Sequence, residues 1–358
     1  MRRLLAFVLL SSPLPAADPP KPDKDGFVPL FNGKDLTGFM NLNCGPKTWS
    51  VKGGELITSG TPYGLLRTDK QYENFEAEFE WMHVNTKEVG NSGFFVWCDP
   101  LPQVGGPYTR GIEVQVLVNL TYTNKEGKVT ASSHGDLFSV SGAKCKPDRP
   151  HPSGSERCLP SENRAKGGGE WNHYRVVAND GRITLAVNGK EVSGISDCTP
   201  RKGYLAFESE GAECHYRNIK IKELPTSNPK PEQVAKVDEG FKPLFNHTDL
   251  TGWESTPGAW KVADGVLKCT GQGELRMAEK HAKFELIFDW KGPAECQVKE
   301  YSTPTTAAGT TVKATKAGQW QRERTVVDFG AVAVSSAFVA ADKLELRNIY
   351  LREIKDGK

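Results

Sequence analysis

The chain has 358 residues, with 46 Lys and Arg against 44 Asp and Glu, so its formal net charge is only +2. This balance gives no electrostatic footprint for nucleic acid or for an anionic membrane surface, and neither partner is expected. The hydrophobic fraction of 37% is low, but 8 Trp, 9 Tyr and 16 Phe can build cores and argue against disorder. The 36 Gly and 23 Pro favour turns and short strands over long helices, and the length suggests two domains.

The N-terminus has the pattern of a secretory signal peptide over residues 1–17. Met1-Arg2-Arg3 precedes the apolar run Leu4 to Leu10, and a Ser, Pro and Ala stretch ends at Ala16-Ala17. The apolar run is too short to span a bilayer, and no later segment has about 18 uninterrupted apolar residues. The alternative is a frayed N-terminal anchor. We expect an exported protein, periplasmic or extracellular, without a transmembrane segment.

The sequence contains an internal repeat. Residues 26–39, GFVPLFNGKDLTGF, return at 240–253 as GFKPLFNHTDLTGW. Four further pairs of segments match in the same order, around Trp49 and Trp260, Trp81 and Trp290, Trp171 and Trp320, and Arg217 and Arg347. Five ordered matches indicate two related domains.

The second copy is shorter than the first. The copies lie 209 residues apart at Trp81 and Trp290 but 149 apart at Trp171 and Trp320, a loss of 60 residues. The predicted organisation is a first domain over 26–224, a Pro-rich polar linker over 225–239 and a degenerate second copy over 240–354. We expect the loss to remove the strand around 112–116 and to leave the framework strands, which places any activity in the first copy.

The segments within each copy are predicted to be strands. Residues 75–81 and 112–116 alternate apolar and polar side chains with a period of two, and 183–187 runs into the hairpin signal Asn188-Gly189. No segment keeps a helical period. Many short strands at close spacing predict an antiparallel sandwich or jelly roll, followed by a second, shortened β-sandwich.

The eight cysteines fit an oxidising compartment. Because no C-x-x-C pair occurs, a structural zinc site is not expected. Cys145 and Cys158 flank a Pro-rich loop and are the pair that we expect to form a disulfide. Cys269 and Cys296 can pair only with each other within the second copy.

The strand at 112–116 is the best candidate for a site. Its period of two puts Glu113 and Gln115 on one face, where a carboxylate and an amide can bind pairs of sugar hydroxyls; the alternative is an ordinary solvent-facing pair. Trp97 is a candidate for stacking on a sugar ring, although a strand tryptophan is more often a core residue. His134 and Asp136 flank a glycine and can supply an acid or base, or simply form a turn.

Other constellations give weaker signals. Arg110 precedes the strand and either binds a sugar hydroxyl or is solvated. No G-x-S-x-G, H-E-x-x-H or phosphate-binding glycine loop occurs. The sequence requires no cofactor; a divalent metal ion held by His134, Asp136 and Glu113 is conceivable, but no spacing rule supports it.

Six ordered motifs resemble the 3-keto-disaccharide hydrolase family. They are Phe27-x-Pro29-Leu30-Phe31-Asn32-Gly33-x-Asp35-Leu36-x-Gly38, Asn91-Ser92-Gly93, Gly111-Ile112-Glu113-Val114-Gln115, Gly169-Glu170-Trp171-Asn172, Val187-Asn188-Gly189 and Arg217-Asn218-Ile219-x-Ile221. The resemblance covers about 26–224, with a degenerate match over 240–354. It implies a concanavalin A-like jelly roll related to glucanases and lectins, and action on glycosides oxidised at C3.

The resemblance also implies a reaction. A 3-ketone acidifies the C2 hydrogen, so a base can remove it and the C1 substituent leaves by β-elimination, after which water adds to the enone. Carried onto this sequence, Glu113 is expected to be the base or a sugar ligand, and His134 the acid or enolate stabiliser. The expected substrate-binding residues are Gln115, Trp97, Arg110, Asp136 and Asn91.

Two comparisons bear on this expectation. Laminarinase-type glucanases of the fold carry E-x-D-x-x-E, whereas this strand has Glu113, Gln115 and Val118, so a retaining mechanism with two carboxylates on the strand is disfavoured. The His134-Gly135-Asp136 turn and the cysteine-bearing loop at 145–158 depart from the family pattern. The alternative functions are a secreted carbohydrate-binding protein without turnover and a structural adhesive protein.

Overall fold

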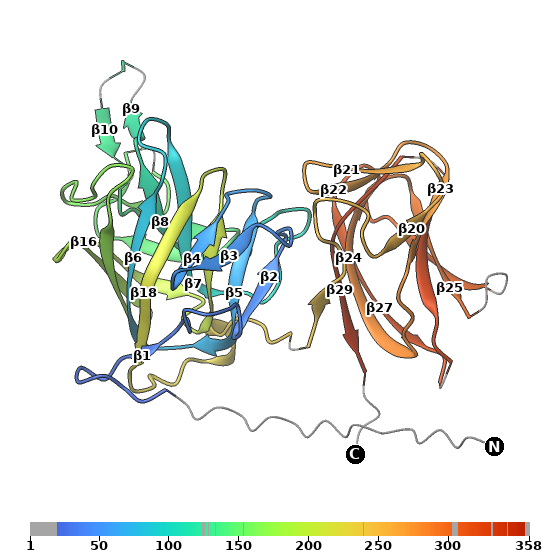
Figure 1. The fold of residues 1–358 in the computed structure, drawn as a ribbon, viewed down its shortest axis with the longest axis horizontal. Coiled ribbons are helices and arrows are strands. Elements are labelled where there is room, and N and C mark those ends of the chain that lie inside the picture. The colour runs from blue at the N-terminus through green and yellow to red at the C-terminus, as the bar shows by residue number, and fades with distance from the viewer. Residues whose placement is uncertain are drawn as a thin grey trace, which may run out of the picture.

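The computed structural model describes residues 20–354, except for 124, 125, 128, 133, 153, 239, 303–306, 331 and 342. The predicted signal peptide at 1–17 lies outside the described residues. Two β-sandwiches lie side by side, the first in blue to yellow and the second in orange to red (Figure 1). The all-β prediction is therefore confirmed. The described part of the chain has no helix long and apolar enough to cross a membrane.

The first sandwich contains two antiparallel sheets, which we name sheets A and B. Sheet A has the spatial order β12-β16-β15-β14-β6-β18-β4-β3, with β1 paired to β18. Its strands are β1 Val28–Pro29, β3 Trp49–Lys52, β4 Glu55–Thr58, β6 Phe75–His83, β12 Lys144–Pro147, β14 Asn172–Asn179, β15 Arg182–Val187, β16 Lys190–Thr199 and β18 Cys214–Glu223.

Sheet B has the order β13-β11-β8-β7-β17-β5-β2. Its strands are β2 Phe39–Leu42, β5 Gly64–Tyr72, β7 Gly90–Cys98, β8 Gly111–Val118, β11 Leu137–Val140, β13 Arg157–Cys158 and β17 Gly203–Ser209. A separate two-stranded ribbon pairs β9 Thr121–Thr123 with β10 Val129–Ser132.

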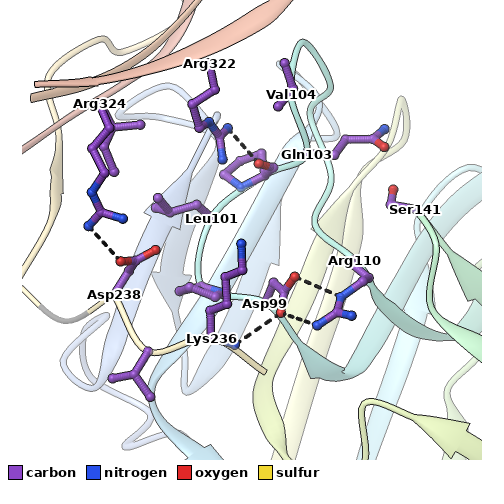
Figure 2. A pocket seen from close by; sticks show the side chains of 14 residues that line it. Asp99, Leu101, Gln103, Val104, Arg110, Ser141, Lys236, Asp238, Arg322 and Arg324 are labelled. Atoms are coloured by element: carbon purple, nitrogen blue, oxygen red, sulfur yellow. Dashed lines mark hydrogen bonds and ion pairs between the residues drawn. The ribbon is translucent and has the colours of Figure 1, made fainter. Parts of the chain in front are cut away.

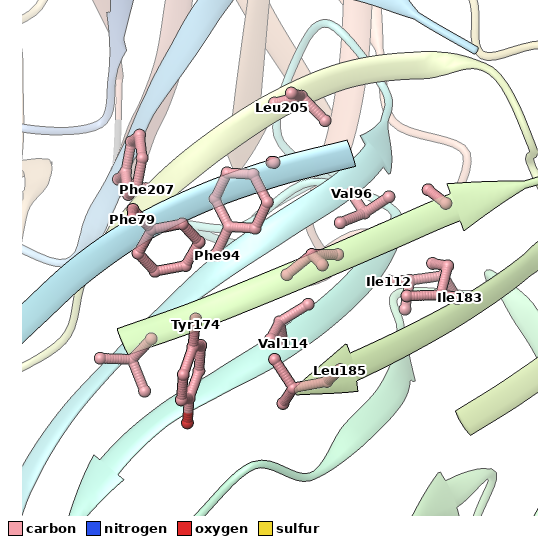
Figure 3. Close-up of a cluster of buried hydrophobic side chains, with 14 of the residues drawn as sticks. Phe79, Phe94, Val96, Ile112, Val114, Tyr174, Ile183, Leu185, Leu205 and Phe207 are labelled. Atoms are coloured by element: carbon pink, nitrogen blue, oxygen red, sulfur yellow. The ribbon is translucent and has the colours of Figure 1, made fainter. Parts of the chain in front are cut away.

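The core of the first sandwich lies between sheets A and B. Phe79 of sheet A packs against Phe94 and Phe207 of sheet B, with ring centroids 5.0 and 5.8 Å apart (Figure 3). Val114 belongs to the same cluster. Because strand side chains alternate, the inward direction of Val114 turns Glu113 and Gln115 to the outer face of sheet B.

The second sandwich repeats this plan in sheets C and D. Sheet C has the order β21-β22-β29-β24-β27 with β19 paired to β29, and sheet D has the order β20-β23-β28-β25-β26. The strands are β19 Lys242–Pro243, β20 Trp253–Ser255, β21 Trp260–Ala263, β22 Val266–Cys269, β23 Gly273–Met277, β24 Lys283–Lys291, β25 Glu295–Tyr301, β26 Ala307–Lys313, β27 Gln321–Asp328, β28 Ser335–Ala340 and β29 Leu344–Glu353. A 3-10 turn, Pro231–Gln233, lies between the two sandwiches in the chain.

The expectation that the second copy lacks the strand of Glu113 is wrong. In sheet D, β26 pairs with β25 as β8 pairs with β7 in sheet B. The described part of the second copy lacks the strands at two sheet edges. In sheet D no described strand corresponds to β11 and β13 beyond β26, and in sheet C none corresponds to β15, β16 and β12 beyond β27. The shorter copy therefore keeps every framework strand and loses the strands added at the sheet edges.

The register of the two copies shows which side chains changed. Val298 lies opposite Thr310 and Phe338, as Phe94 lies opposite Val114 and Phe207. This alignment puts Gly309 at the place of Glu113, Thr311 at that of Gln115 and Val339 at that of Glu208. The second copy keeps the strand but not its carboxylates.

The outer face of sheet B packs against the outer face of sheet C. Leu42, Leu65 and Ala206 from sheet B form one buried cluster with Ile287 and Tyr350 from sheet C. The second sandwich therefore covers the part of sheet B around β2, β5 and β17. It lies next to the part that carries Glu113.

The expected disulfides are absent from the structure. All eight cysteines are described, and all are free and buried. The thiol of Cys145, on sheet A, points to the carbonyl of Glu156, and that of Cys158, on sheet B, to the carbonyl of Leu159, each at 3.5 Å. Cys269 and Cys296 are also free. Cys145 and Cys158 belong to one buried cluster, yet their thiols are not bonded to each other.

Glu300 in β25 makes the stability of the second sandwich depend on pH. It is buried, and burial raises its pKa to about 7. Its protonated form therefore contributes stability at pH 4, and this contribution is lost as the pH rises through 7. We expect Glu300→Gln to stabilise the protein at pH 8, by on the order of 1 kcal/mol, and to change little at pH 4. Urea unfolding at both pH values measures this; an equal effect at both would contradict the assignment.

Candidate functional site

A cluster of three glutamates lies on the outer face of sheet B. Glu113 comes from β8, Glu208 from β17, and Glu210 directly follows β17. Glu113 and Glu208 are only 5% and 1% exposed. Glu210 is half-buried and forms part of the rim.

Gly93 makes room for two of these carboxylates. It lies on β7, between β8 and β17, and a Cβ atom there would stand 2.8 Å from Oε1 of Glu113 and 2.8 Å from Oε2 of Glu208. Only glycine leaves this space free. In the second copy the same position holds Gln297, so the gap is filled where the carboxylates are missing.

The carboxylates raise one another's affinity for protons. Burial and the charge of Glu210 raise the pKa of Glu113 well above its usual range, Arg157 opposes this shift, and Asp136 adds to it. Burial and the charges of Glu113 and Glu210 likewise raise the pKa of Glu208. Because like charges at this distance repel, we expect the cluster to hold both a proton and a negative charge near neutral pH.

Amide side chains connect the cluster to its rim. Gln115 donates from Nε2 to Oδ1 of Asn91 at 2.9 Å and approaches Oε1 of Glu113 at 3.4 Å. Asn91 in turn donates to Oε2 of Glu210. The structure therefore brings together Glu113, Gln115 and Asn91 of the predicted residues.

A cation lies on the other side of Glu113. Glu113, Phe138 and Arg157 lie opposite one another on β8, β11 and β13. Arg157 stacks on the Phe138 ring at 3.8 Å and binds Asp136 with an N–O distance of 3.1 Å. Asp136 is completely buried, and burial raises its pKa to about 7 even though Arg157 lowers it. Asp136 is thus a structural partner of Arg157 beside the cluster.

Tyr108 lies near all three glutamates. Its ring packs on Phe95, with centroids 6.3 Å apart, and it belongs to the loop between β7 and β8. Burial and the charges of Glu208, Glu210 and Glu113 raise its pKa, so its hydroxyl keeps its proton. That hydroxyl and Oε2 of Glu208 are both buried beside the carboxylate of Glu210, which raises the pKa of each group.

His134 contacts a different neighbourhood. Its Nδ1 hydrogen-bonds Oδ1 of Asn163 at 2.8 Å, and the carbonyl of the adjacent Gly135 accepts from Ser193 Oγ at 2.6 Å. Burial lowers the pKa of His134, while the Asn163 contact raises it. None of these contacts joins His134 to the glutamates.

Arg110 lies in a pocket between the two sandwiches. Its Nε and Nη2 bind the two carboxylate oxygens of Asp99, each at 2.9 Å (Figure 2). The pocket has a volume of about 700 Å³ and also includes Lys236, Asp238 and Arg324. Arg110 is therefore committed to an ion pair outside the glutamate cluster.

Trp97 is a core residue in the structure. Its ring is completely buried, and Nε1 donates to the carbonyl of Glu73 at 2.6 Å. Val96 and Trp97 both belong to the core because the backbone at Trp97 has a φ of 55°, which breaks the alternation of β7. A buried ring offers no face for a sugar.

We expect Trp97→Phe to destabilise the protein by about 1 to 3 kcal/mol, because the carbonyl of Glu73 loses its donor. Saccharide affinity should stay unchanged. Urea unfolding and a saccharide titration measure the two quantities; lost affinity with unchanged stability would restore Trp97 as a stacking residue.

Sequence reasoning missed Glu208, Glu210, Tyr108 and Arg157. The segment 204–208 does show strand alternation, which puts Glu208 and Ala206 on one face. The alternation does not show that β17 lies beside β7, which brings Glu208 close to Glu113; only the strand order of sheet B shows this.

Solved structures of other proteins are similar to part of this chain. A protein from Parabacteroides distasonis, titled a "putative glycosyl hydrolase", is 24% identical over 56% of this chain and 95% of its own, with a TM-score of 0.44. The carbohydrate-binding module CBM66 from Bacillus subtilis is 11% identical over 53% of this chain and 98% of its own, with a TM-score of 0.38. No curated protein matches the chain.

The family is shown by the sequence itself. The model of the 3-keto-alpha-glucoside-1,2-lyase-like domain matches residues 26–222 and 240–298, which together make up more than half of the chain. The first match contains the glutamate cluster, and the second ends within β25, before the strands that would carry equivalents of Glu113 and Glu208. The chain therefore belongs to the family of 3-keto-alpha-glucoside-1,2-lyase-like domains.

Proposed function

We propose that this protein is an exported enzyme that cleaves glycosides oxidised at C3, by removal of the C2 proton and β-elimination of the C1 substituent. The observation that carries the proposal is the cluster of Glu113, Glu208 and Glu210 around the gap at Gly93. Family membership supports it. The proposal that the protein is exported rests on the N-terminal sequence pattern alone.

The reaction needs a base and an acid at the same time. The base takes the C2 proton, and the electron pair of the C2–H bond delocalises into the C3 carbonyl as an enolate. The enolate then forms the C1–C2 double bond while the C1–O bond breaks, and the acid protonates the leaving oxygen. The products are a 3-keto enone and the free aglycone, and addition of water to the enone gives the 3-keto sugar.

The cluster can supply both groups. Carboxyl groups in one buried site have separated proton affinities, so one acts as base while another acts as acid. We assign the base to Glu113, whose pKa Arg157 lowers, and the acid to Glu208, whose pKa the charges of Glu113 and Glu210 raise. We assign the binding of sugar hydroxyls to Gln115 and Asn91, which are hydrogen-bonded to each other, and donation to the enolate oxygen to the Tyr108 hydroxyl.

This assignment changes the predicted role of His134, because its contacts lead away from the cluster. Among the described residues, no group of three His, Cys, Asp or Glu side chains is arranged to hold a metal ion. Added divalent metal is a variable of the assay.

The assay compares a 3-keto-glucoside with its unoxidised parent, with and without divalent metal, and follows aglycone release by the mature protein. Release from the keto form alone is the expected result. Release from neither, with binding to both, would replace the enzyme by a carbohydrate-binding protein. Equal release from both would indicate an ordinary hydrolase.

A further inference from the structure

The loop that carries Tyr108 is attached on its far side to the second sandwich. This loop, residues 99–110, joins β7 to β8. The amide of Gly105 donates to Oδ2 of Asp289 at 2.9 Å. Asp289 is completely buried on β24, where it also accepts from Asn348 Nδ2 at 2.6 Å and from Arg322 Nε at 2.7 Å.

The carbonyl groups of the loop are bound as well. Asn348 Nδ2 approaches the carbonyls of Gln103 and Gly106, each at 3.1 Å. Arg322 donates from Nη2 to the carbonyl of Pro102 at 2.8 Å, and Arg347 Nη1 donates to the carbonyl of Gly105 at 2.9 Å. Side chains of β24, β27 and β29 in the second sandwich thus bind the backbone of the loop at residues 102, 103, 105 and 106.

The fit is close at Gly105. Its φ is +68°, a conformation that favours glycine, and a Cβ atom there would lie 2.3 Å from the ring of Trp320. Three residues later, Tyr108 places its hydroxyl at the glutamates. Asn43 of the first sandwich also donates to the carbonyl of Pro107, at 3.0 Å, so the position of that hydroxyl depends on both sandwiches.

The internal repeat provides a reference for these contacts. Asp289, Arg347 and Asn348 correspond to Glu80, Arg217 and Asn218 of the first copy, because Asp289 lies opposite Arg347 as Glu80 lies opposite Arg217. Asn218 also binds the acidic residue of its own copy, at 2.9 Å, but it is exposed to solvent and holds no loop. In both copies the asparagine thus binds the acidic residue, and the three residues of the second copy also bind the 99–110 loop.

We propose that the second sandwich, which lacks the carboxylates, is a positioning domain for the site of the first. Asp289, Arg322 and Asn348 hold the 99–110 loop so that the Tyr108 hydroxyl stands at the glutamate cluster. Asn348 is a positioning residue that acts through Tyr108. The effect on turnover rests on the proposed function, whereas the holding of the loop does not.

The test uses Asn348→Ala, with Asn218→Ala as the matched control, in the full chain. With a 3-keto-glucoside we expect kcat to fall about tenfold or more in Asn348→Ala and to stay unchanged in Asn218→Ala, because small displacements of reacting groups reduce rates strongly. When Tyr108 is already replaced by Phe, Asn348→Ala should lower kcat by less than about a further twofold, because the effects of coupled residues are not additive. An equal loss in both backgrounds, or no loss, would overturn the proposal.

Amide hydrogen exchange of the 99–110 loop supplies a readout that needs no turnover. We expect faster exchange at Gly105 and Gly106 in Asn348→Ala than in wild type or Asn218→Ala. If exchange were faster in Asn348→Ala but the wild-type protein showed no turnover, the proposed function would fail and the attachment of the loop to the second sandwich would stand. Unchanged exchange in Asn348→Ala would overturn this attachment itself.

Discussion

Glu113→Gln is expected to lower kcat for a 3-keto-glucoside by about 10²- to 10⁴-fold, the usual contribution of a general base. The amide has nearly the same shape as the carboxylate and keeps an oxygen near Gln115, but it cannot take the C2 proton. Binding of the unoxidised parent glucoside should change little. Steady-state kinetics and a binding titration measure the two effects.

The matched control is Glu300→Gln. Glu300 is also a buried glutamate whose pKa burial raises, but it lies in the second sandwich. This variant should retain wild-type turnover. Retention of more than half the activity in Glu113→Gln would show that Glu113 is not the base.

Gly93→Ala is expected to lower kcat by about 10²-fold, because the added methyl displaces the carboxylates of Glu113 and Glu208. The displaced atoms are the ends of side chains, so the sandwich should still form. The expected result is a folded protein with an impaired site, and circular dichroism together with kinetics distinguishes the two properties.

Gly167→Ala serves as its control, because a Cβ atom at Gly167 would meet nothing within 4 Å. It should behave as wild type in both measurements. If Gly93→Ala also kept wild-type kcat, the gap between the carboxylates would have no part in the reaction.

The sequence alone predicted the features that depend on local pattern. The repeat, the many short strands and the shared face of Glu113 and Gln115 all follow from ordered motifs and a period of two. Glu208 and Glu210 were missed because β17 is far from β8 in the chain, and its position in sheet B is a long-range property. Arg157 reaches Glu113 across β11 for the same reason.

Other expectations failed where the chain departs from regular alternation or where proximity in sequence was misleading. Trp97 turns inward because its positive φ breaks the strand pattern. Cys145 and Cys158 flank one loop, yet both thiols are free. The 60 residues missing from the second copy do not include the equivalent of β8. That strand is present as β26, although its sequence no longer resembles β8.

The central claim is that the C2 hydrogen leaves the sugar during cleavage. The most direct measurement follows the label of a 3-keto-glucoside deuterated at C2, cleaved in ordinary water. Labelled 3-keto-glucose in the same buffer corrects for spontaneous exchange. We expect early product, as enone or as hydrated 3-keto sugar, to have lost the C2 deuterium. Early product that keeps its deuterium at C2 would contradict elimination and would indicate direct displacement at C1.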